Sequence, residues 1–125
     1  MTDQSTIFSN TLDNDLSNVE VTTELMARFF RTLGEVTRLN IVMLLLEEDE
    51  LFQMEIVRRL GLSQGRVSEH LNCLVWCGLV QSRTQGRRVM YSVANDEVKA
   101  LLGLALQRLK ANESEIATCS RLDSN

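Results

Sequence analysis

Two cysteines in the middle of the chain have a spacing that suits metal binding. Cys73 and Cys77 are four positions apart, so on a helix they share one face with their Cβ atoms ~5–6 Å apart. From that separation two thiolates can reach one metal ion, and soft metal ions prefer thiolate ligands. The alternative is that both cysteines pack as small apolar residues.

A third cysteine, Cys119, lies near the C-terminus, and we expect this tail to fold back and supply a third thiolate. Three thiolates suit Cd(II), Pb(II) or Hg(II), whereas a structural zinc site normally has four ligands. His70 is the nearest candidate for a fourth ligand, but we interpret it as a residue that packs or hydrogen-bonds between helices.

The N-terminus is polar and acidic, without the basic start and apolar stretch of a signal peptide. The longest apolar run, residues 41–46, is too short to span a bilayer. We therefore expect a cytoplasmic protein with no membrane partner. In that reducing compartment, three cysteines favour metal binding or redox sensing over a disulfide framework.

The elements that must position these residues follow from the spacing of the apolar side chains. Capping residues and glycines mark their ends. The predicted helices are 22–33 (capped by Thr22 or Thr23), 38–46 (capped by Thr37), 53–60, 64–76 (capped by Ser63) and 96–111 (capped by Asn95 or Asp96). The predicted strands are 79–83 and 89–93. We expect a flexible arm over 1–20, one domain over 21–111 and a C-terminal tail over 112–125.

Two short helices in tandem, 53–60 and 64–76, are typical of a helix-turn-helix with Gly61 in the turn. A β-hairpin with its tip at Gln85-Gly86 follows directly. This order predicts a mainly α fold with a β-hairpin wing, a winged helix-turn-helix. The acidic run 47–50 is expected to be a solvated surface loop.

The charge of the chain is unevenly distributed. The net charge is −4, yet residues 56–91 contain six arginines and a single acidic residue, Glu69. A basic window within an acidic chain is a candidate surface for binding a polyanion.

Helix 64–76 is the expected recognition helix, because its polar side chains fall outside its apolar cluster. Gln and Asn can pair with adenine and Arg with guanine in the major groove, and arginines beside the hairpin tip can hold phosphates or enter a minor groove. The candidate DNA-binding residues are Ser63, Gln64, Arg66, Ser68, Glu69, Asn72, Arg83, Arg87 and Arg88.

The first and last helices, 22–33 and 96–111, carry apolar stripes that are available for a homodimer matching two operator half-sites. The alternative is that both stripes are used within the monomer core. Because the cysteine pair lies on the recognition helix, a metal ion that binds the DNA-free form more tightly would weaken DNA binding, and DNA would weaken metal binding equally.

Three segments resemble the ArsR/SmtB family of metal-responsive repressors. Residues 33–41 (LGEVTRLNI) are similar to the family's opening motif, residues 62–80 to its recognition helix and residues 86–91 to its wing. The resemblance covers about residues 26–93. It departs from the family at Val36, which replaces the usual proline, and at Glu69, where a DNA-contacting residue is often His.

The resemblance to the family limits which of its known types of metal site this chain can carry. Residues 50–55 lack the Cys-x-Cys of arsenic-type sensors, and the last helix has no histidine for a zinc-type site. The remaining candidate ligands, Cys73 and Cys77, are similar to the cysteine pair of the CmtR-type cadmium/lead sensors. Those sensors add a third cysteine from the tail, here Cys119. Mercury-responsive members are a close competitor. The family implies an apo dimer on DNA that is released by metal.

Two other functions remain open from the sequence. One is a thiol-oxidation sensor in which Cys73 or Cys77 pairs with Cys119. The other is a winged-helix protein-interaction module without DNA binding. An enzyme with a small-molecule substrate is not expected, because His70 lacks a matching nucleophile and the chain has no phosphate-binding loop.

Overall fold

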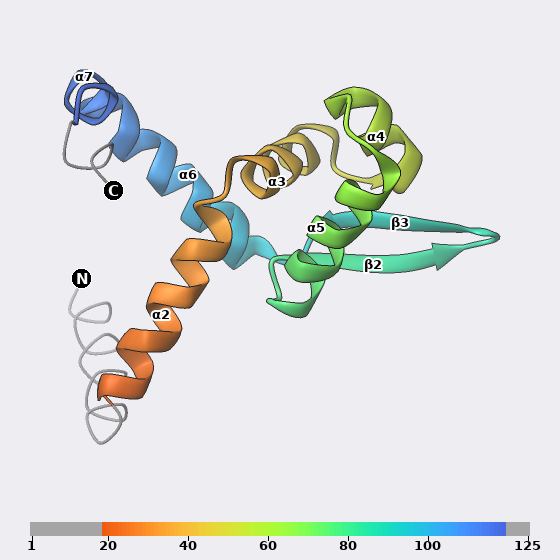
Figure 1. Ribbon diagram of the computed structural model, residues 1–125, viewed down its shortest axis with the longest axis horizontal. Helices are drawn as coiled ribbons and strands as arrows, with labels where there is room; N and C mark the ends of the chain where they lie inside the picture. The colour runs from red at the N-terminus through yellow and green to blue at the C-terminus, as the bar shows by residue number, and fades with distance from the viewer. Residues whose placement is uncertain (1–18, 120–125) are drawn as a thin grey trace.

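The computed structural model describes residues 19–119, with side chains from residue 22 onward. The predicted winged helix-turn-helix is confirmed (Figure 1). Its elements in chain order are α2 (Val19–Leu33), α3 (Val36–Glu48), β1 (Leu51–Phe52), α4 (Gln53–Leu60), α5 (Gln64–Trp76), β2 (Val80–Gln85), β3 (Arg88–Val93), α6 (Asp96–Ala111) and α7 (Glu113–Ala117). The predicted arm over residues 1–20 lies outside the described residues, except that Val19 and Glu20 begin α2.

The helix-turn-helix has the predicted bounds. Gly61 closes α4 in the left-handed region at φ +67°, and its N–H donates to the Val57 carbonyl at 2.9 Å. The Ser63 hydroxyl then accepts the Arg66 N–H at 3.2 Å, which starts α5 as a capping residue does. A left-handed glycine followed by a serine cap explains why the turn between the helices is so short.

The sheet has three antiparallel strands in the order β1-β3-β2. Toward the tip, β2 runs two residues and β3 one residue further than predicted, so that Gly86-Arg87 is the loop rather than Gln85-Gly86. Gly86 takes a φ of +63°, as the first position of a type II′ turn requires. Strand β1 was not predicted, because two residues carry no alternating pattern; it pairs Leu51 with Tyr91 and Phe52 with Met90.

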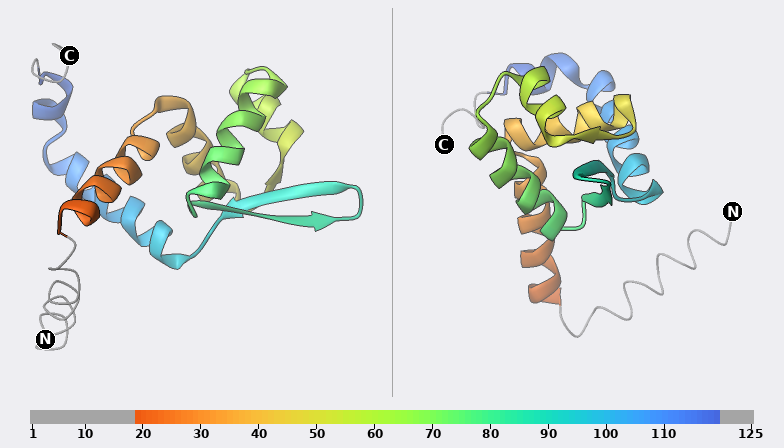
Figure 2. Two further views of the ribbon diagram at one scale, coloured as in Figure 1. Left: turned by 60° about the horizontal axis from the view of Figure 1, so that its bottom comes forward. Right: turned by 90° about the vertical axis from the view of Figure 1, so that its right-hand side faces the viewer.

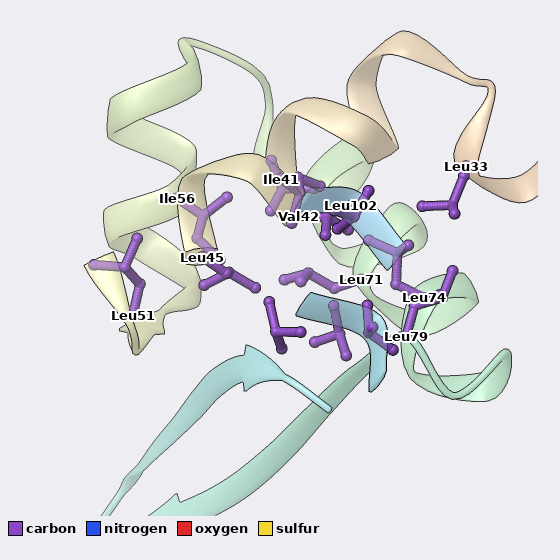
Figure 3. Close-up of a cluster of buried hydrophobic side chains, with 14 residues drawn as sticks. Leu33, Ile41, Val42, Leu45, Leu51, Ile56, Leu71, Leu74, Leu79 and Leu102 are labelled. Carbon is purple, nitrogen blue, oxygen red and sulfur yellow. The ribbon is translucent and has the colours of Figure 1, made fainter. Parts of the chain in front are cut away.

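A single apolar core joins α3, α5 and the sheet (Figure 3). Val67, Leu71 and Leu74 on α5 are at most 1% exposed, which fixes the inner face of that helix. The other buried core residues are Leu33, Ile41, Val42, Leu45, Leu51, Ile56, Leu79, Val80, Val93, Val98 and Leu102. The recognition helix is therefore anchored by its apolar face, and its remaining side chains point outward.

Helices α2 and α6 leave this body on the side opposite to the hairpin, as Figure 1 and the left view of Figure 2 show. Among the side chains described on these two helices, those in the buried core are Leu33 of α2 and Val98 and Leu102 of α6. The large apolar side chains exposed on the two outer helices and α7 are Leu25, Met26, Phe30, Leu104, Leu106, Leu109 and Ile116. The predicted stripes are therefore divided between core and surface, since Leu33, Val98 and Leu102 are buried while Leu25, Phe30 and Leu109 are exposed, and their use in a dimer stays a prediction.

Several predicted boundaries are wrong for local reasons. Helix α2 begins at Val19 and passes through Thr22 and Thr23 instead of being capped by them. Helix α3 is capped by Glu35, not Thr37, because the Glu35 carboxylate accepts the Arg38 N–H at 2.9 Å.

The acidic run is not a simple surface loop, because α3 continues to Glu48 and ends where Asp49 takes a φ of +68°. The predicted tail also contains α7, a short helix that follows directly on α6.

Candidate DNA and metal sites

The outward side of α5 carries the polar residues expected to read DNA. Gln64, Arg66, Glu69 and Asn72 are exposed, and Ser68 is half-buried. Ser63, which caps the helix, is exposed as well. Because the opposite face is locked into the core, these side chains form one continuous solvent-facing surface over the N-terminal two-thirds of the helix.

The three wing arginines have different surroundings. Arg87 lies in the loop at the tip. The Arg88 guanidinium stacks over the Phe52 ring, 4.4 Å from its centroid. Arg83 forms a two-pronged ion pair with Glu50, with both nitrogen–oxygen distances at 2.6 Å. Only the tip arginine is therefore without a described partner that would compete with DNA.

The acidic residues before the sheet act on this basic surface, which sequence reasoning missed. The Arg83 guanidinium lowers the pKa of the Glu50 carboxyl through its hydrogen bonds, and Glu50 in turn raises the pKa of Arg83. Glu48 pairs with Arg59 of α4 at 2.6 Å. The acidic residues Glu48 and Glu50 thus hold two of the six arginines between residues 56 and 91 in ion pairs. A count of charges along the sequence does not reveal these pairs.

Cys73 and Cys77 lie together at the C-terminal end of α5, as their spacing predicted. Cys73 is half-buried and Cys77 is exposed. Burial raises the pKa of the Cys73 thiol, and the Cys77 thiol, which is its hydrogen-bonding neighbour, raises that pKa further, while the nearby Arg38 charge opposes the shift. The Cys77 N–H donates to the Cys73 carbonyl at 3.0 Å, so the two residues lie one helical turn apart, as the spacing predicts.

The pair borders α2. The Cys77 sulfur lies 3.8 Å from the Thr32 hydroxyl, and Cys77 opens onto a surface groove of about 470 Å³. The groove is lined by Leu25, Arg28, Phe29, Thr32, Trp76 and Cys77. Trp76 is 91% exposed and lies at the edge of this groove.

Cys119 is not close to this pair within one chain. It follows α7, at the outer end of α6 and away from α5 (Figures 1 and 2). Over residues 19–119, no three histidine, cysteine, aspartate or glutamate side chains are grouped closely enough to hold a metal ion. A three-thiolate site therefore needs the C-terminal segment to move or a second copy of the chain.

Next to the cysteines, three helices meet around Arg38. Its guanidinium donates to the Thr32 carbonyl at 2.7 Å and lies 3.5 Å from His70 Nδ1. Glu35, whose pKa is lowered chiefly by the Arg38 N–H, lies 3.9 Å from the same nitrogen. His70 is thus a half-buried residue of a polar junction between helices, consistent with the prediction that it hydrogen-bonds there.

Comparison with known proteins agrees with this geometry. The sequence profile of the "Bacterial regulatory protein, arsR family" matches residues 35–82. The chain is 41% identical over 96 residues to the "Probable mercury resistance operon repressor" of Streptomyces lividans, covering 77% of this chain and 76% of that protein. The chain belongs to the arsR family.

Another arsR-type relative is the "HTH-type transcriptional regulator CmtR" of Mycobacterium bovis, 34% identical over 72% of this chain and 75% of that one. A solved structure with a similar fold is the homodimeric winged helix-turn-helix domain Mb0332 from Mycobacterium bovis. Its TM-score is 0.67 at 27% identity, over 76% of this chain and 86% of that one. Family membership makes the chain a DNA-binding transcriptional regulator. Among residues 19–119, no helix has the length and apolar character to cross a membrane.

Proposed function

We propose that this arsR-family regulator is a cytoplasmic repressor that binds operator DNA as a metal-free homodimer. A soft ion, Cd(II), Pb(II) or Hg(II), releases it by binding Cys73, Cys77 and Cys119. The observation that carries the proposal is the placement of Cys73 and Cys77 one turn apart at the end of the recognition helix, with Cys77 exposed. The name of the Streptomyces relative, a probable mercury resistance operon repressor, supports a metal response.

DNA recognition is assigned to the exposed polar face of α5 and to the arginines of the wing. In the major groove, Gln64, Arg66 and Asn72 of α5 would contact base edges, with Ser63 and Ser68 beside them on the phosphates. Glu69 accepts rather than donates hydrogen bonds, so its partner would be the cytosine amino group. Arg87 and Arg88 of the wing would contact the backbone or an adjacent minor groove.

Dimer formation is assigned to the exposed apolar faces of α2 and α6. Burying side chains such as Phe30, at 52% exposed, and Leu104, at 65% exposed, removes apolar surface from water, which drives association. A second copy also offers a source for the third thiolate, since Cys119 lies far from the cysteine pair of its own chain. Metal binding and dimer geometry would then depend on one another.

The proposal is tested by measuring operator affinity while each metal is titrated under reducing conditions. The probe is the DNA upstream of the regulator's own gene, with Cd(II), Pb(II), Hg(II) and Zn(II) added separately. Cys73→Ser and Cys77→Ser should keep metal-free DNA binding and lose release by the effective ion. Cys119→Ser should respond more weakly than the wild type, because the helical pair supplies most of the site.

Two outcomes would reject the metal mechanism. Normal release of either Cys73→Ser or Cys77→Ser would show that the ligands lie elsewhere. Wild-type protein that ignores every ion but releases DNA after oxidation would favour the thiol-oxidation sensor, in which Cys73 or Cys77 pairs with Cys119.

A further inference from the structure

Arg38 of α3 holds the C-terminal end of α2. Its Nε donates to the Thr32 carbonyl at 2.7 Å, and a terminal guanidinium nitrogen donates to the Arg31 carbonyl at 3.4 Å. Both carbonyls belong to the last turn of α2, where a positive charge is favoured by the helix dipole. Arg38 therefore fixes how α2, which carries an exposed apolar face, joins the body.

The same guanidinium also reaches the recognition helix. Its Nη1 lies 3.5 Å from Nδ1 of His70, and its charge acts on the thiol of Cys73, one turn further along α5. Cys77, the other member of the pair, contacts Thr32 through its sulfur at 3.8 Å. One side chain thus lies between the end of α2 and the part of α5 that carries the cysteines.

We propose that Arg38 is a positioning residue that couples occupancy of the cysteine pair to the placement of α5 against α2. The inference rests on the proposed metal response and names the residue that transmits it. A guanidinium has five N–H donors in a rigid fork. A metal held by Cys73 and Cys77 would draw the Cys77 sulfur away from the hydroxyl of Thr32, the residue whose carbonyl Arg38 holds. The contact that sets the angle between α5 and α2 is then weakened.

Coupling is measured as the ratio of operator affinities without and with saturating metal. Arg38→Lys keeps the positive charge but lacks the planar guanidinium. It should therefore bind metal nearly as the wild type does, while its coupling ratio falls about tenfold. Arg38→Met removes the charge as well and should weaken both metal affinity and coupling. Metal affinity is followed by the thiolate-to-metal absorption band, and the Tm of each variant is recorded.

The matched control is Arg58→Met, which removes an exposed arginine of α4 away from the cysteines. It should lower operator affinity equally with and without metal and leave the coupling ratio unchanged. A ratio that stays at the wild-type value in both Arg38 variants, whatever their Tm, overturns the inference. If Arg38→Met does not fold, Arg38→Lys decides alone. If the wild type shows no coupling at all, the proposed function itself fails, which is a distinct result.

Discussion

The body of the molecule, formed by α3, α4, α5 and the sheet, and the outer helices α2 and α6 differ in how much of their apolar surface is buried. In the body, α3, α5 and the sheet share one core in which Ile41, Ile56 and Leu74 have no exposed surface. In the outer helices, Leu25, Phe30 and Leu104 are more than half exposed. The body thus buries its apolar residues within one chain, with Leu33, Val98 and Leu102 contributed by the outer helices, whereas much of the other apolar surface of those helices is exposed. The cysteine pair lies where the two regions meet, so it can act on both.

The largest expected effect separates the two regions by stability. Leu74→Ala removes a fully buried side chain from the body and should lower the free energy of unfolding by ~2–5 kcal/mol at any protein concentration. Leu104→Ala, on α6, should cost little in the monomer, and its effect should vanish on dilution. Denaturant unfolding at two protein concentrations measures both. If both variants lost the same unfolding free energy at both protein concentrations, Leu104 would belong to the same core as Leu74.

The second expected effect concerns association. Leu104→Asp places a charge on the exposed apolar face of α6, where an interface would leave it desolvated and unpaired. The dissociation constant of the dimer should rise about a hundredfold, or ~2.8 kcal/mol, as measured by analytical ultracentrifugation. Glu97→Asp, an exposed position at the start of the same helix, is the control for a mild change on α6. An unchanged dimer in Leu104→Asp would place the interface elsewhere.

The contrast between body and outer helices also explains how far the sequence could predict the molecule. The recognition helix was placed with correct bounds because its signals are local: Ser63 caps it and three apolar residues repeat along one face. Strand β1 was missed because a two-residue strand exists only through its pairing with β3. The Glu50–Arg83 pair was missed for the same reason, since its partners are 33 positions apart.

The candidate site divides in the same way. The placement of Cys73 and Cys77 one turn apart follows from a four-residue spacing on a helix, which any α-helix reproduces. The position of Cys119 depends on contacts over long distances in the sequence, or between chains, that no spacing encodes. Arg38 was known only as part of a family-like motif; that it joins α2 to α5 emerges from three helices meeting in space.

The third expected effect compares the two DNA-contacting elements of the body. Arg66→Ala should cost ~1–3 kcal/mol of operator affinity and relax the preference at one base position, as loss of a base contact does. Arg87→Ala, at the wing tip, should weaken binding to all sequences alike and reduce the salt slope by about one. Lys110→Ala, at the outer end of α6, is the charge control. Identical sequence preferences in wild type and Arg66→Ala would remove Arg66 from base reading.

The smallest expected effect concerns the ion pair that holds Arg83. Glu50→Gln frees the Arg83 guanidinium for a phosphate, so the salt slope of DNA binding should steepen by about one. Glu48→Gln, which frees Arg59 of α4 instead, is the matched control.

The same ion pair also makes stability depend on pH. Since the pKa of Glu50 is lowered in the folded chain, its pair with Arg83 stabilises the fold above the ordinary carboxyl pKa. That stability is lost as the pH falls through the lower folded pKa. The difference in unfolding free energy between wild type and Glu50→Gln should therefore be present at neutral pH and disappear in acid. A pH-independent difference would mean that packing of the side chain, and not its charge, ties the wing to the body.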